Sequence, residues 1–129
     1  MEKRYHHGDL KTQLIKAGLR MIQEEGIKKL SLRKLAQVCN VSEAAPYSHF
    51  KNKEELLIAI QNFVTEQLTL CLKNAYESTE DSNSPQAIFN MGVAYIRFFI
   101  SYPEYYSFLF NQSCLNIDLT DNLNSNEFE

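Results

Sequence analysis

Hydrogen-bond donors and cations gather between Arg33 and Lys53. Tyr47 and His49 carry donors, and Lys51 and Lys53 add ammonium groups a few positions later. Such groups bind phosphate oxygens and position a protein on a nucleic acid. Arg33 adds a planar fork of donors that suits the edge of a guanine. These residue types predict contact with nucleic acid.

Three residues before Tyr47 occupy the leading end of the same segment, where a protein would face bases. Ser42 and Ala44 are small, and Glu43 carries a carboxylate that can accept a hydrogen bond from cytosine N4. Phosphates would repel that carboxylate. A favourable charge at a helix N-terminus explains Glu43 equally well, so both interpretations stay open.

Two short helices joined by a tight turn must position these side chains. In the first helix, apolar residues recur at helical spacing: Leu32, Leu35, Ala36 and Cys39. Ser31 is placed to cap that helix, and Asn40 suits the left-handed backbone of the turn. Ser42 would cap a second helix over 43–50, with Phe50 facing the core. Residues 31–50 thus predict a helix-turn-helix motif; alone, it favours DNA binding and plain packing equally.

A helix that precedes the motif in the sequence should pack against it. An apolar face repeats there at helical spacing, at Leu10, Leu14, Ala17, Met21 and Ile22. Asp9 is placed to cap this helix and Gly26 to end it. Ahead of it, Tyr5, His6 and His7 follow two basic residues; they form either a basic arm near DNA or a frayed terminus. No third ligand accompanies the histidines, so we expect no metal site.

A long helix should follow the motif. Asn52 and Glu55 form a capping pair, and Lys51 and Lys53 beside the helix start predict a phosphate clamp. An apolar stripe then continues to about Tyr76 with helical period, at Leu56, Leu57, Ile60, Val64, Leu68, Cys71, Leu72 and Ala75. The stripe predicts a helix that links the motif to the rest of the chain.

The second half of the chain is rich in aromatic residues. A polar loop from Ser78 to Gln86 precedes a helix over 87–101 whose apolar residues cover nearly every face, which predicts enclosure by neighbouring helices. Pro103 breaks that helix, and five aromatic residues follow within 102–110. Core packing explains this density as well as a functional surface does, which would be a ligand pocket or a protein interface. The candidate ligand-binding residues are Tyr95, Phe98, Phe99, Tyr105 and Tyr106.

Composition excludes several classes of protein. The 129 residues are 44% hydrophobic, with four glycines and no alternating strand pattern, so we expect an all-α fold. No stretch predicts a membrane span or secretion signal, which favours a cytoplasmic protein without membrane partners. Cys39, Cys71 and Cys114 lack metal or redox spacing and are expected as buried free thiols. No catalytic triad, metal cluster or phosphate-binding glycine loop appears, so we predict neither an enzyme nor a cofactor.

The net charge of −3 hides a strong polarity along the chain. Residues 1–53 carry 11 basic and 5 acidic residues, for a net charge of +6. Residues 54–129 carry 2 basic and 11 acidic residues, for a net charge of −9. A basic first part attracts phosphates, while the acidic remainder would be repelled from them. The polarity therefore supports the predicted nucleic-acid contact at the motif.

From Tyr5 to about Ala59 the chain resembles the N-terminal domain of the TetR family of bacterial transcriptional regulators. Five segments match in order: YHHGDL, EEG, LSLRKLA, VSEAAPYSHF and KNKEELL. The resemblance implies a recognition helix that ends at Phe50 and a phosphate contact by Tyr47. Pro46 departs from the leucine that is often found in the family, which puts the geometry of the helix start in question. The implied DNA-binding set is Ser31, Arg33, Ser42, Glu43, Ala44, Tyr47, His49, Lys51 and Lys53.

The family also implies a function for the whole chain. We expect a three-helix DNA-binding domain over 8–68 and a small, incomplete helical regulatory domain over 69–129, whose ligand-binding and dimerisation helices end in a frayed acidic tail. The first hypothesis is a repressor that binds a palindromic operator on double-stranded DNA as a homodimer and responds to a small apolar effector. The alternative is a truncated helical interaction protein that pairs with a longer paralogue. Because the resemblance implies further helices after residue 110, we expect an exposed patch over 87–110, a different dimer, or a chain truncated relative to its ancestors.

Overall fold

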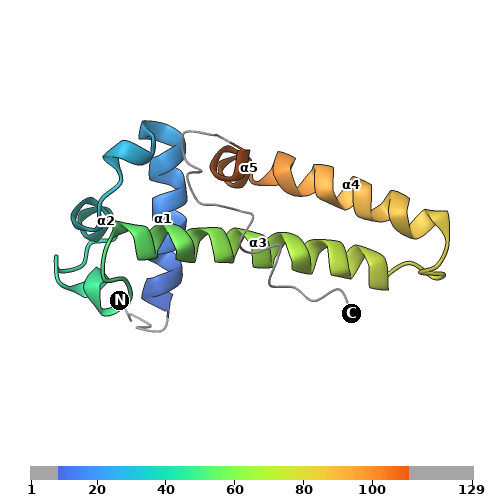
Figure 1. Ribbon diagram of the computed structural model, residues 1–129, viewed down its shortest axis with the longest axis horizontal. Helices are drawn as coiled ribbons and strands as arrows, with labels where there is room; N and C mark the ends of the chain where they lie inside the picture. Colours follow the sequence, from blue (N-terminus) through green and yellow to red (C-terminus); the bar gives the residue numbers. More distant parts are fainter. Residues whose placement is uncertain (1–8, 111–129) are drawn as a thin grey trace, which may run out of the picture.

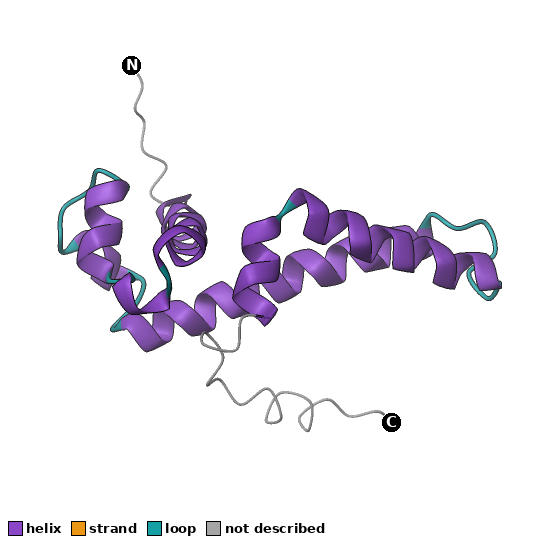
Figure 2. Ribbon diagram, turned by 90° about the horizontal axis from the view of Figure 1, so that it is seen from above, coloured by secondary structure: helices purple, strands orange, loops and turns teal. Residues whose placement is uncertain are grey.

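The computed structural model describes residues 9–110, and every regular element in that range is helical, which confirms the predicted all-α fold. The elements are α1 (Leu10–Glu25), η2 (Ile27–Lys29), α2 (Leu32–Val38), η3 (Ala45–Ser48), α3 (Lys53–Glu77), α4 (Pro85–Ser101) and α5 (Pro103–Phe110). Figures 1 and 2 show α3 running the length of the molecule, with α1 and α2 at one end and α4 alongside the other. The predictions for the arm at 3–7, for Cys114 and for the tail lie outside the described residues.

Two predicted caps fix where α2 and α3 begin. The Ser31 hydroxyl oxygen accepts a 3.1 Å hydrogen bond from the Lys34 amide. The Asn52 side-chain oxygen accepts a 2.9 Å bond from the Glu55 amide. The Glu55 carboxylate reaches back to the amide of Lys51, at 2.9 Å. The first two bonds satisfy amides in the first turns of α2 and α3, and the third ties the residue before the Asn52 cap to α3, so the local sequence sets these helix starts.

The ends of α1 differ from each other. At its C-terminus Gly26 takes φ +89°, a backbone conformation that favours glycine, and its amide donates to the Ile22 carbonyl oxygen. At its N-terminus Asp9 occupies the cap position, but its side chain makes no capping hydrogen bond. Its backbone is helical rather than extended, so the carboxylate does not face the first free amides. The prediction that Asp9 caps α1 is therefore wrong.

One hydrophobic core joins the elements from α1 to α5. Leu14, Leu35, Ile60 and Phe108 are each fully buried within it, and α3 contributes the predicted stripe as far as Val64. Helix α1 packs on both α3 and α5, while α4 packs chiefly on α3. Leu68 and Cys71, further along the stripe, are partly buried against the same core. The core therefore extends from the motif at one end of the molecule into the second half of the chain.

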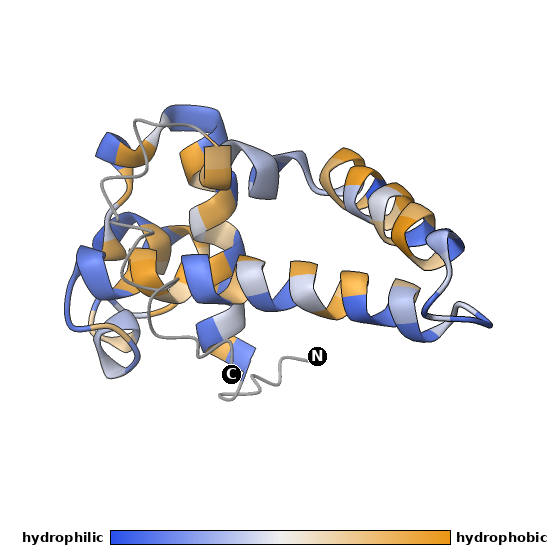
Figure 3. Ribbon diagram, turned by 45° about the vertical axis from the view of Figure 1, so that its right-hand side comes forward, coloured by the Kyte–Doolittle hydropathy of each residue, from blue (hydrophilic) through white to orange (hydrophobic). Residues whose placement is uncertain are grey.

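Helix α4 is not enclosed by its neighbours. Only Ala87 and Phe98 on it are buried, while Ile88 and Ile100 are 76% and 74% exposed. Figure 3 shows apolar segments along most of this helix, interrupted by paler and hydrophilic ones. The prediction of an enclosed helix is wrong. Apolar composition alone does not tell how many faces of a helix are covered, and here the described residues bury one face of α4. The exposed patch expected over 87–110 is present.

Candidate nucleic-acid interface

Helix α2 and the turn after it have the predicted geometry. Leu35 and Ala36 are fully buried, and the Val41 amide donates a 2.9 Å hydrogen bond to the Ala36 carbonyl oxygen. Asn40 takes φ +56°, and it is the one non-glycine residue with positive φ among residues 9–110. Its left-handed backbone reverses the chain within a few residues. The segment after α2 is thereby held against the rest of the motif.

The second helix of the motif is shorter than predicted. Instead of an α-helix over 43–50, the chain forms the four-residue 3-10 helix η3, and the residue at its N-cap position is Ala44 rather than the predicted Ser42. Pro46 lacks an amide hydrogen, and the amide of Tyr47 bonds three residues back, to the carbonyl oxygen of Ala44. Proline in the first turn thus favours the tighter helix. Phe50 closes the segment and is buried as predicted.

Most of the predicted DNA-binding side chains are exposed around this segment. Tyr47 is 55% exposed, beside a buried Pro46, so its hydroxyl is available to a partner. The other exposed members of the set are Arg33, Ser42, Glu43, Ala44 and Lys51. Ser31, His49 and Lys53 are only partly exposed. The two short elements therefore bring six of the nine predicted residues to the surface.

Arg33 and Glu43 meet across the motif. The Arg33 Nε–H group donates a 3.0 Å hydrogen bond to Glu43 Oε1, and the two side chains are 72% and 64% exposed. The pair connects the first turn of α2 with the residues that precede η3. Sequence reasoning considered each residue for contact with a base and did not predict their mutual contact, since ten residues separate them.

The two lysines of the predicted phosphate clamp differ in their surroundings. The Lys53 ammonium donates a 2.6 Å hydrogen bond to the carbonyl oxygen of Ile27, in a partly buried position. The Lys51 side chain is exposed. Lys53 therefore uses one of its three donor hydrogens within the protein. Two more exposed cations, Lys28 and Lys29 in η2, lie outside the predicted set although their paired sequence is a recognisable basic signal.

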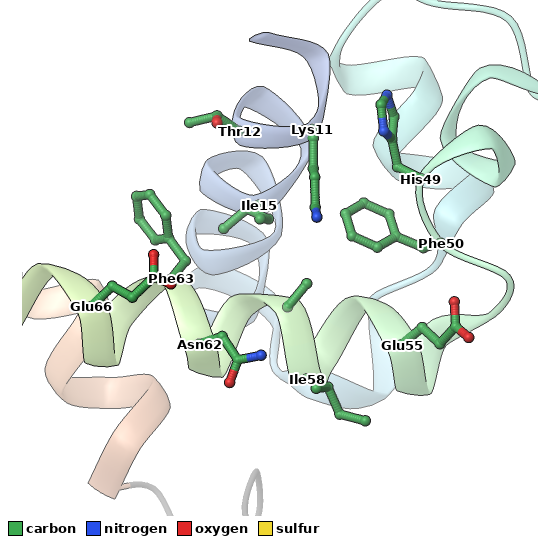
Figure 4. A pocket seen from close by; sticks show the side chains of 11 residues that line it. Lys11, Thr12, Ile15, His49, Phe50, Glu55, Ile58, Asn62, Phe63 and Glu66 are labelled. Carbon is green, nitrogen blue, oxygen red and sulfur yellow. The ribbon is translucent and has the colours of Figure 1, made fainter. Parts of the chain in front are cut away.

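His49 lies at the edge of a hollow between α1 and α3. This hollow has a volume of about 480 Å³. Figure 4 shows His49 and Lys11 on its upper side, Phe50 between them and α3, and Glu66 at the far end. The imidazole ring is 6.2 Å from the Phe50 ring, centroid to centroid. His49 therefore lies next to the buried ring of the residue that follows it.

The five candidate ligand-binding residues form one aromatic network. Phe98 contacts Phe99 and Tyr105 at centroid distances of 5.2 and 5.6 Å, and Phe99 contacts Tyr95 and Tyr106 at 5.0 and 5.7 Å. Only Phe98 among the five also lines the hollow of about 570 Å³ between α3 and α4. Burial raises the pKa of the Tyr105 phenol, and Glu104 raises it further. The structure brings the five together, mainly against one another.

The remaining polar groups give no indication of a metal site or a disulfide within the described part of the chain. No group of three or more His, Cys, Asp or Glu side chains could hold a metal ion among residues 9–110. Cys39 and Cys71 are free and half-buried, and burial raises the pKa of the Cys39 thiol while nearby Arg20 opposes that shift. No helix between residues 9 and 110 combines the length and the apolar character needed to cross a bilayer.

Three comparisons place this geometry among known proteins. An uncharacterised helix-turn-helix-type transcriptional regulator from Haemophilus influenzae is 35% identical over 72 residues, which are 56% of this chain and 38% of that protein. The nicotine-responsive transcriptional repressor HdnoR of Paenarthrobacter nicotinovorans is 34% identical over 73 residues, which are 57% and 38% of the two chains. The chain thus spans little more than a third of these curated relatives. The solved structure of a TetR-family transcriptional regulator from Haemophilus influenzae aligns with a TM-score of 0.71 and 26% identity, over 96% of this chain and 66% of that one.

The capped helix α2, the left-handed turn at Asn40 and the exposed η3 define a helix-turn-helix protein. Residues 14–60 match the family model described as bacterial regulatory proteins of the tetR family. Over this region the chain is similar to transcriptional regulators of the TetR family. This confirms the resemblance read from the sequence.

Proposed function

We propose that this chain binds DNA sequence-specifically as a transcriptional regulator, as a repressor that occupies a palindromic operator in dimeric form. The main observation in support is the exposed, cationic surface of the motif, to which Arg33 of α2, Tyr47 of η3 and Lys51 in the segment before α3 contribute. Their donors are the kind that contact phosphates and base edges. The family of residues 14–60 supports the same role.

The test is binding to the DNA upstream of the protein's own gene over a range of salt concentrations. If each motif neutralises about 4 to 6 phosphates, the plot of log affinity against log salt concentration should have a slope near −4 to −5 per motif. Lys51→Ala should reduce the size of that slope by about 1. Arg97→Ala removes an equal charge on α4 and should leave the slope unchanged. Absence of binding, or binding independent of salt, contradicts the proposal.

The dimer and its effector form a finer part of the proposal. A palindromic operator requires two motifs related by two-fold symmetry, so a light-scattering mass of two chains supports the repressor. A small apolar effector would bind against the aromatic network of Tyr95, Phe98, Phe99, Tyr105 and Tyr106. HdnoR is named as nicotine-responsive, which is a property of that protein. A strict monomer at working concentration would contradict the dimeric repressor.

The exposed face of α4 favours one alternative function. A helix with Ile88, Ile96 and Ile100 facing outward offers an apolar stripe to another helical chain. The chain would then pair with a longer family member and modulate its DNA binding. Mixing with such a paralogue and measuring the mass of the complex separates the two functions, since the repressor requires no second protein.

A further inference from the structure

The contact between Arg33 and Glu43 determines which edge of the arginine is left for a partner. The Nε–H group, which lies nearest the aliphatic part of the arginine side chain, donates to Glu43 Oε1 at 3.0 Å. The terminal Nη groups make no hydrogen bond within the described residues. An exposed ion pair of this kind adds little to stability, so orientation is its main physical consequence.

Guanine recognition depends on that orientation. A guanine presents O6 and N7 side by side in the major groove, and arginine binds them with two parallel N–H groups. With Nε occupied, the pair of terminal Nη groups is the fork that stays available. One of the two Glu43 carboxylate oxygens, Oε1, already accepts from Arg33 and so ties this side chain to the guanidinium. The geometry therefore favours base contact by Arg33, with Glu43 holding the Arg33 side chain in place.

We propose that Glu43 is a positioning residue that holds the Arg33 guanidinium for end-on recognition of a guanine, without contacting a base itself. This inference rests on the proposed DNA-binding function. It also gives Glu43 a second effect: its negative charge offsets that of Arg33, which lowers attraction to phosphates of any sequence. Glu43 thus lowers the affinity for DNA of any sequence and increases the preference for guanine at one base pair.

The test is selection of bound sequences from a random duplex DNA library, followed by titration of the selected duplex and of single-base variants. The full chain is compared with Arg33→Ala, Glu43→Ala and Glu43→Gln. Arg33→Ala should lose the preference for guanine at one position by about 5- to 100-fold, the range of one bidentate contact. Glu43→Ala should lose much of the preference at that same position, and the double variant should lose no more than Arg33→Ala.

Glu43→Gln distinguishes positioning from charge. Its amide oxygen can still accept from the Arg33 Nε–H group, so the guanine preference should be retained while affinity for all sequences rises. Glu80→Gln removes the same charge from the exposed loop between α3 and α4, and it should change neither quantity. Because Arg33 and Glu43 are exposed, their variants should fold, as circular dichroism would confirm.

Three results would overturn the inference while leaving DNA binding intact. Glu43→Ala could keep the guanine preference in full, it could lose a preference at a different position from Arg33→Ala, or the wild-type chain could bind with salt dependence and no base preference. Failure of the wild-type chain to bind any duplex would instead remove the proposed function. The two failures are therefore distinguishable in one set of measurements.

Discussion

The Lys53 ammonium donates a 2.6 Å hydrogen bond to the main-chain carbonyl oxygen of Ile27, which joins the first residue of α3 to the turn after α1. This bond spans 26 residues of sequence and lies beside the motif. It indicates a structural role for a residue that the sequence suggested for phosphate binding alone.

Replacing Lys53 by Met should lower the free energy of unfolding by about 1 to 2 kcal/mol, because the Ile27 carbonyl oxygen loses a charged donor in a partly buried position. Lys51→Met, on an exposed neighbour, should change it by less than about 0.5 kcal/mol. Urea denaturation followed by circular dichroism measures both. Equal effects of the two substitutions on stability would show that the bond to Ile27 contributes nothing.

Tyr47→Phe should weaken binding to all DNA sequences by a similar factor, because we propose that this exposed phenol contacts phosphate rather than a base. One neutral hydrogen bond predicts a loss of about 2- to 10-fold. Tyr76→Phe removes an exposed hydroxyl near the far end of α3 and serves as the control. A changed base preference in Tyr47→Phe would assign this side chain to base recognition.

Two glycines in helices should respond to alanine in opposite directions. A Cβ atom at Gly18 would lie 3.0 Å from Ile60 Cδ1, and Ile60 is fully buried, so Gly18→Ala should destabilise by about 1 to 3 kcal/mol. A Cβ atom at Gly92 meets nothing within 4 Å. Gly92→Ala should therefore stabilise by up to about 1 kcal/mol through helix propensity. Thermal unfolding of both variants tests the contrast, and a stabilising Gly18→Ala would contradict it.

Phe108→Ala should destabilise by about 3 to 5 kcal/mol, because this ring is fully buried where α5 meets the core. Phe110→Ala removes a ring that is half exposed on the same helix and should cost about 1 kcal/mol. Chemical denaturation gives both values. Similar losses from the two variants would mean that α5 is held by its exposed aromatic side rather than by the core.

The starts of α2 and α3 could be predicted from sequence because their determinants are local. Ser31 and Asn52 cap helices through amides three residues away, so the information lies within one turn. Asn40 and Gly26 likewise reveal positive φ by residue type. Pro46 was also apparent in the sequence, but not its effect on the helix. That effect depended on competition between α-helical and 3-10 hydrogen bonds, and the chain forms the 3-10 helix.

Contacts between distant residues could not be predicted in the same way. The Arg33–Glu43 and Lys53–Ile27 bonds join residues 10 and 26 positions apart, and both depend on how the elements pack. Helix α4 illustrates the same limit, since its composition is equally compatible with enclosure and exposure. For the DNA-binding set, residue types suited to contact could be predicted from the sequence, whereas the internal partners of Arg33 and Lys53 became visible only in the structure.

Helix α3 has one further consequence, which concerns how the molecule melts. Its 25 residues span about 37 Å without interruption, and the proposed division at residue 68 falls inside it. Leu14 from α1 and Phe108 from α5 belong to the same core as Ile60 from α3. Loss of either end of the helix would remove packing from the other. The described residues should therefore unfold as one cooperative unit, with a single calorimetric transition.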